Sequence, residues 1–147
     1  MTRARAVAAG SLAALFLAVG PAGPADAVRD GEWTRGVATV HVQKTVLLNP
    51  DATVTVRARL KCEPEWQPSQ LDARVTQGEA SAEGYTVPSV PCDDHWHEAL
   101  LVLPTLSPAG FHPGRVDISI QFLLTHVEFG DFSGAHDQAR GRLVPAG

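Results

Sequence analysis

Hydrophobic and polar positions alternate in several stretches of this chain, with a period of two residues. Between residues 54 and 62, Val, Ala, Leu and Cys occupy the even positions, whereas Thr, Arg and Lys occupy the odd ones. The same pattern recurs between residues 116 and 124. Side chains of a β-strand point alternately to its two faces, so both stretches are predicted to be strands with one buried face.

Seven short strands are predicted from this alternation and from the Pro, Gly and Asn signals between them. They lie at about residues 37–48, 54–62, 71–75, 84–87, 97–103, 116–124 and 138–144. Residues 63–70, with Pro64 and Pro68, are predicted to form a loop, and the apolar run 99–103 is predicted to be buried on both sides or to carry a bulge. No amphipathic helix of about ten residues or more is found. The fold class is therefore predicted to be all-β, an immunoglobulin-like antiparallel β-sandwich of about seven strands.

Residues 1–27 have the features of a secretory signal peptide. The chain begins with a short basic segment. This is followed by an uncharged apolar run from Ala6 to Val19 and then by the sequence Ala25-Asp26-Ala27. This order is typical of an exported protein with an A-x-A cleavage site. We expect cleavage before Val28, a single secreted domain over residues 28–147, and no membrane attachment afterwards. The alternative is an N-terminal anchor or a buried helix.

Composition narrows the function classes. Without the first 27 residues, the chain has 120 residues with 10 Lys and Arg against 15 Asp and Glu, a net charge of −5. This length supports one hydrophobic core, and the acidic balance disfavours nucleic-acid binding. The sequence lacks the motifs of serine hydrolases, nucleotide-binding loops, zinc proteases and EF-hands. We therefore expect a non-enzymatic monomer with no cofactor and no nucleic-acid partner.

The chain contains two cysteines, Cys62 and Cys92. An even number of cysteines in an exported domain favours a disulfide. Cys62 shares the apolar side of its predicted strand, so the bond is expected at the edge of the core. The alternative is a pair of free or metal-bound thiols.

Residues 92–98 hold a dense group of metal-ligand side chains. His95 and His97 would project to the same side of a strand, where such a pair can chelate Cu(II), Zn(II) or Ni(II), with Asp93 or Glu98 as an oxygen donor. A third imidazole would have to come from elsewhere, and no spacing selects it. The alternative is a polar strand entry with solvated imidazoles and with Trp96 packed inward.

Arg57, Arg59 and Lys61 form a basic row on the polar side of their predicted strand. In an acidic protein such a row suits contact with an anionic cell-wall polymer or an acidic partner. The alternative is a solvated face whose charges pair across strands with carboxylates such as Asp72 or Asp117.

Phe129 and Phe132 lie among glycine and carboxylate residues between positions 128 and 134. Loops at the end of a sandwich often build binding surfaces, and two aromatic rings there suit the anchoring of a partner. The alternative, which we favour from the sequence, is that both rings fold back and cap the core.

Four short motifs follow one another along the chain. They are Arg59-Leu60-Lys61-Cys62, Val75-Thr76-Gln77-Gly78, Cys92-Asp93-Asp94 followed by His97, and Pro113-Gly114-Arg115-Val116. In this order the chain resembles a family of small exported actinobacterial domains that has no assigned biochemical function. The resemblance implies an exported β-sandwich with a Cys62–Cys92 bridge, and it supplies no catalytic residues.

These observations predict a secreted binding domain that contacts an unknown protein or a cell-wall component through its end loops or an exposed sheet face. Two alternatives belong to other classes. One is a metal-binding protein that uses His95 and His97. The other is a carrier that holds a small ligand in a pocket between the sheets.

Overall fold

The computed structural model describes residues 36–147, which form eight strands and no helix. The strands are β1 (Ala38–Val42), β2 (Thr45–Leu48), β3 (Val54–Cys62), β4 (Trp66–Gln77), β5 (Ala80–Thr86), β6 (His97–Leu103), β7 (Gly114–His126) and β8 (Phe132–Pro145). The all-β prediction is confirmed. None of these residues belongs to a helix that could cross a membrane. The predicted signal peptide lies outside the described residues.

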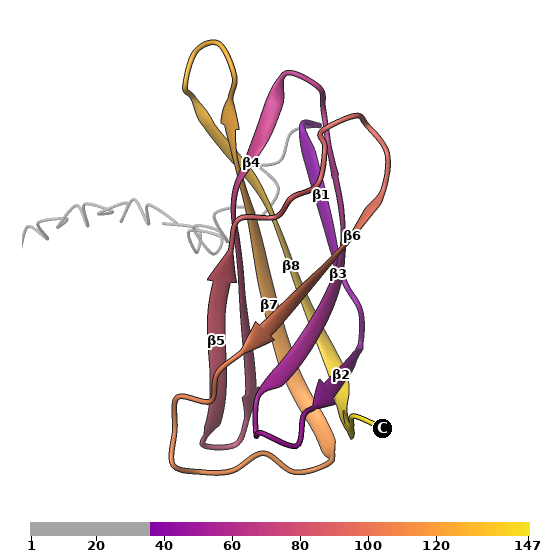
Figure 1. Cartoon of the computed structure of the whole chain (residues 1–147), viewed down its shortest axis with the longest axis vertical. Coiled ribbons are helices and arrows are strands. Elements are labelled where there is room, and N and C mark those ends of the chain that lie inside the picture. Colours follow the sequence, from indigo (N-terminus) through magenta and orange to yellow (C-terminus); the bar gives the residue numbers. More distant parts are fainter. Residues whose placement is uncertain (1–35) are drawn as a thin grey trace, which may run out of the picture.

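One hydrogen-bonded sheet folds over to make two layers. Its strand order is β1-β3-β2-β8-β7-β4-β5, and β6 pairs with the other edge of β3. All pairs are antiparallel except β2 with β8, which is parallel. Because β2 bonds to both β3 and β8, the sheet turns there. One layer contains β1, β3 and β6, and the other contains β8, β7, β4 and β5 (Figure 1). The immunoglobulin-like relationship stays a prediction.

The turn of the sheet depends on a close approach of two backbones. The carbonyl oxygen of Lys44, between β1 and β2, accepts a hydrogen bond of 2.7 Å from the backbone of Arg142. A Cβ atom at Gly141 would collide with this carbonyl and would lie 2.6 Å from Cδ1 of Ile118. Glycine at this position therefore allows the chain to pass over β8.

The core lies between the layers and is apolar throughout. Among the described residues, no polar or charged side chain is buried. The largest fully buried side chains are Phe122, Leu60, Leu71, Leu103, Ile118, Ile120, Leu124, Leu143, Val46, Val54, Val56 and Val75. The even positions from Val54 to Cys62 in β3 and from Val116 to Leu124 in β7 are all buried, as the alternation predicted, since each strand covers the core with one face only.

Several predicted boundaries are wrong, since β5 begins at Ala80 and β8 at Phe132, and two of the errors have a clear physical reason. The first predicted strand is interrupted at residues 43–44, because β1 pairs with β3 only, whereas β2 pairs with both β3 and β8. The predicted loop at residues 63–70 is mostly strand, because β4 begins at Trp66 and continues through Pro68. The pairing with β7 shifts between Pro68 and Gln70, and such an irregularity tolerates a residue that has no N–H to donate.

The apolar run at residues 99–103 is neither buried on both sides nor bulged. Its pairing with β3 continues without a shift from Leu103 to His97. Leu101 is 3% exposed, whereas Leu100 is 60% exposed and Val102 is 61% exposed. The prediction fails because β6 has a covered inner face only, so the ordinary strand alternation places two aliphatic side chains in solvent.

Candidate interaction surface

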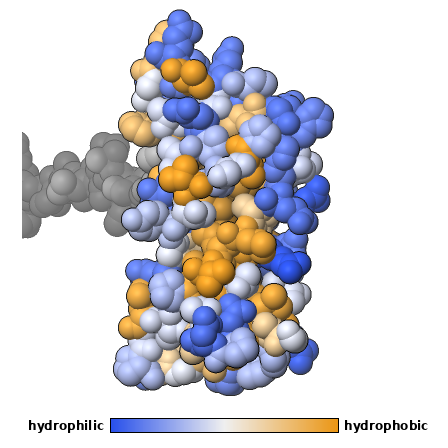
Figure 2. All heavy atoms as spheres, in the orientation of Figure 1, coloured by the Kyte–Doolittle hydropathy of each residue, from blue (hydrophilic) through white to orange (hydrophobic). Residues whose placement is uncertain are grey.

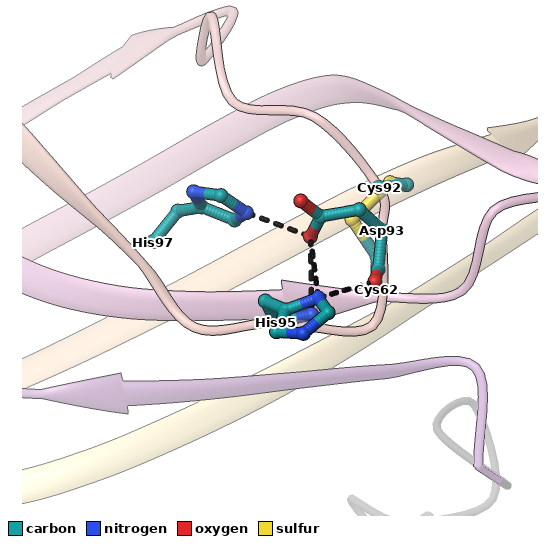
Figure 3. The surroundings of a disulfide bond; sticks show 5 residues. All are labelled: Cys62, Cys92, Asp93, His95 and His97. Atoms are coloured by element: carbon teal, nitrogen blue, oxygen red, sulfur yellow. Dashed lines mark hydrogen bonds and ion pairs between the residues drawn. A yellow bond between two sulfur atoms is a disulfide. The ribbon is translucent and has the colours of Figure 1, made fainter.

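The Cys62–Cys92 disulfide joins the end of β3 to the segment that precedes β6 (Figure 3). Its Cα atoms are 4.7 Å apart, and Cys62 is 2% exposed, which confirms the predicted place at the edge of the core. The backbone N–H of Asp94 also donates a 2.9 Å hydrogen bond to the carbonyl of Cys62. Two links therefore hold this segment against β3. The alternative of free or metal-bound thiols is wrong.

Asp93 lies between the two predicted histidine ligands (Figure 3). The ring of His97 donates a hydrogen bond of 2.7 Å from Nε2 to Oδ1 of Asp93, and the ring of His95 donates one of 2.7 Å from Nδ1 to the backbone carbonyl of Asp93. The hydrogen bond from His97 holds the pKa of Asp93 below its usual range. Within residues 36–147, no group of three or more His, Cys, Asp or Glu side chains is arranged to hold a metal ion. Metal binding by His95, His97 and Asp93 stays a prediction.

Trp96 is on the outside of the molecule, and the interpretation that packs it inward is wrong. It is 37% exposed, and its ring stacks on that of His41 with centroids 5.1 Å apart. The guanidinium carbon of Arg59 lies 5.1 Å from the Trp96 ring centroid. Trp96 precedes the first residue of β6, so strand parity does not determine its direction.

The predicted basic row is on the outer face of β3, as expected, but its predicted partners are wrong. Lys61 lies 3.4 Å from a carboxylate oxygen of Asp94, on the segment held by the disulfide. Asp72 and Asp117 belong to the other layer, where Asp72 accepts a hydrogen bond from Gln70 and Asp117 lies 3.6 Å from Arg140. Within residues 36–147, neither Arg57 nor Arg59 forms an ion pair with a carboxylate.

The exposed aliphatic residues of β6 lie directly beside this basic row. In the β3–β6 register Leu100 is opposite Arg57, and Val102 is opposite Thr55. The space-filling view has a group of apolar side chains on the face that this layer presents (Figure 2). We call the outer surface formed by Arg57, Arg59, Trp96, Leu100 and Val102 the cationic face. Glu98 lies on the same side, opposite Arg59 in the register, without an ion pair to it.

A second exposed apolar group lies at the end of the β7–β8 hairpin, which reaches the top of the view in Figure 1. Val127 is 64% exposed, Phe129 69% and Phe132 75%. The favoured interpretation, in which both phenylalanines cap the core, is therefore wrong. We call the segment from Val127 to Phe132 the hairpin tip.

The hairpin tip is held in shape by His126. Nδ1 of His126 accepts hydrogen bonds of 3.2 Å from the backbone N–H groups of Glu128 and Phe129. Its ring stacks on that of Phe129, with centroids 4.8 Å apart, and meets the ring of Trp66 edge-on at 5.0 Å. The backbone N–H of Val127 donates to the carbonyl of Glu65 at 3.0 Å. The tip is thus a supported projection with an apolar surface.

The hairpin tip is also acidic. Glu128 and Asp131 lie on it, and neither forms an ion pair among the described residues. Glu65, at its base, lies 3.8 Å from Nε2 of His126. The two surfaces therefore share exposed apolar groups and have charges of opposite sign.

A hollow of about 460 Å³ lies on the outer side of the other layer. Its lining includes Asp72, Arg74, Tyr85, Gln121 and His136. These side chains belong to the solvent side of β4, β5, β7 and β8, so this hollow differs from the pocket between the sheets that a small-ligand carrier requires.

The exposed aliphatic pair of β6 and the aromatic support beneath the hairpin tip were not predicted from the sequence. The alternation that continues from His97 places Leu100 and Val102 on one side with Glu98, and this signal could have found them. The contact of Trp66 with His126 joins residues far apart in sequence, and no local pattern encodes it.

In comparisons with protein families and with curated proteins, nothing matches this chain.

Proposed function

We propose that this chain is an exported, non-enzymatic binding domain, and that its cationic face docks a partner with both apolar and acidic groups. The observation that carries the proposal is the exposure of Leu100 and Val102 beside Arg57 and Arg59, neither of which forms an ion pair with a carboxylate among residues 36–147. Aliphatic side chains left in solvent on a sheet face gain free energy when a partner covers them. The arginines select a partner with carboxylates, because a cation would be repelled.

Export is supported by the signal-like N-terminus and by the disulfide. Structural disulfides persist in oxidising compartments and are rare in the cytosol of mesophiles. A protein partner suits the face better than a purely polar polymer does, because Leu100 and Val102 offer no hydrogen-bonding groups to sugar hydroxyls. The exposed indole edge of Trp96 adds an amphipathic contact of the kind enriched in protein interfaces.

The proposal is tested by capture on the immobilised, oxidised chain from culture medium and from cell-envelope extract. Wild type is compared with Arg57→Glu/Arg59→Glu and with Leu100→Ser/Val102→Ser. Arg115→Glu is the matched control, because Arg115 is equally a surface cation but lies on the other layer. We expect a partner that wild type and the control retain and that both face variants lose. Capture that both face variants retain, or no capture at all, would overturn the proposal.

A further inference from the structure

The hairpin tip and the cationic face are complementary to each other. We propose that a second copy of this chain is a partner of the domain, with the tip of one copy seated on the cationic face of the next. This inference rests on the proposed function and names its partner. A second copy suits the cationic face because the hairpin tip carries both apolar side chains and carboxylates, the two kinds of group that the face is proposed to bind.

The charges on the two surfaces form no ion pairs within the described part of one copy. Arg57 and Arg59 have no carboxylate partner, and Glu128 and Asp131 have no cationic partner, among the described residues. The whole chain has a net charge of −4. An acidic tip is therefore repelled by the net charge of a second copy, and it is attracted where arginines lie beside apolar groups, as they do on the cationic face.

The apolar groups match in the same way. The tip presents Val127, Phe129 and Phe132, each more than 60% exposed, and the face presents Leu100 and Val102 at similar exposure. Contact between the two surfaces removes both groups from water at once. Aromatic anchors are common in the centres of interfaces. The tip also lies at the end of the molecule, where it can reach the side of another copy (Figure 1).

The support of the tip favours docking without rearrangement. His126, with 12% of its side chain exposed, fixes the backbone of Glu128 and Phe129 and stacks on the Phe129 ring. A preorganised surface loses less conformational entropy on binding than a mobile loop does.

The association is head-to-tail, because the two surfaces are different parts of one chain. A copy that binds through its tip leaves its own face free, so dimers extend into longer chains or close into rings. A single hairpin tip covers a small area, and small interfaces are weak. We therefore expect monomers in dilute solution and growing assemblies as the concentration rises.

The decisive test mixes two variants that each lack one surface. Phe129→Ser/Phe132→Ser removes the tip, and Arg57→Glu/Arg59→Glu removes the face. Sedimentation velocity should show a wild-type average mass that rises with concentration, and each variant alone should stay monomeric. An equal mixture should form one-to-one dimers and nothing larger, because only one intact tip and one intact face can meet.

The proposal is overturned if wild type stays monomeric up to millimolar concentration, or if the mixture stays monomeric where wild type associates. Unchanged unfolding temperatures check that both variants fold. A second variant adds Glu128→Lys/Asp131→Lys to the face variant, so that both signs are reversed. Restored association at low salt supports the charge pairing, and failure of this folded variant to associate would contradict it. A monomeric mixture together with face-dependent capture of another protein would leave the proposed function intact and remove this inference alone.

Discussion

Removal of the Cys62–Cys92 disulfide should lower the stability of this domain by a predictable amount. The bond closes a loop with a sequence separation of 30 residues. The chain-entropy relation for a loop of this length gives about 3.7 kcal/mol at 25 °C. With a urea dependence of about 2 kcal/mol per molar for a domain of this size, the unfolding midpoint should fall by about 1.8 M.

Cys62→Ala/Cys92→Ala is the variant to measure, by urea unfolding followed with far-ultraviolet circular dichroism. Alanine avoids a buried hydroxyl at position 62, where the side chain is 2% exposed. Wild type unfolded in the presence of a thiol reductant is the control, since it loses the cross-link but keeps both sulfur atoms. Equal losses in the two samples assign the effect to loop closure. A midpoint shift smaller than about 0.5 M in both would refute the calculation.

Four further outcomes are expected. Asp93→Asn should lower the melting temperature at neutral pH and have no effect in strong acid. The pKa of the Asp93 carboxyl is below its ordinary 3.8 in the folded state, so the stability that the ionised carboxylate adds is lost as the pH falls through the folded-state pKa. Gly141→Ala should cost about 2 kcal/mol of unfolding free energy through its collision with a backbone carbonyl; Gly110→Ala, which has nothing within 4 Å, is the control. Calorimetry with Cu(II) and Zn(II) should detect no site tighter than about 10 µM, and a tight site that His95→Ala abolishes would favour the metal-binding alternative. Mass spectrometry of the exported product should find Val28 at its N-terminus, and a retained N-terminal segment would contradict the signal-peptide prediction.

The sequence predicted strands well where one face of a strand is buried and the other solvated. β3 and β7 follow from their alternation alone, because each inward position is apolar and nearly every outward one is polar. β6 was misinterpreted because Leu100 and Val102 are apolar although they face solvent. An apolar residue type indicates that burial of its side chain is favourable. Whether the side chain is in fact buried depends on how the two layers are placed.

The candidate site was predicted in part for the same reason. The outer position of Arg57, Arg59 and Lys61 followed from parity, since they alternate with buried residues of β3. Their partners did not follow, because strand order decides which carboxylates are near, and Asp72 and Asp117 belong to the other layer. Long-range pairing of strands leaves little trace in the local pattern.

The arginines of the cationic face also limit non-specific association through β6. A strand at the edge of a sheet with exposed aliphatic side chains is a liability, because it invites non-specific association. Among the described residues β6 pairs with β3 alone, and Leu100 and Val102 are open to solvent. Charged neighbours oppose such contacts, because burying an arginine without a carboxylate is costly. Under the proposed function, Arg57 and Arg59 restrict the apolar pair to acidic partners. Their replacement by neutral residues should then weaken specific docking and also promote indiscriminate aggregation.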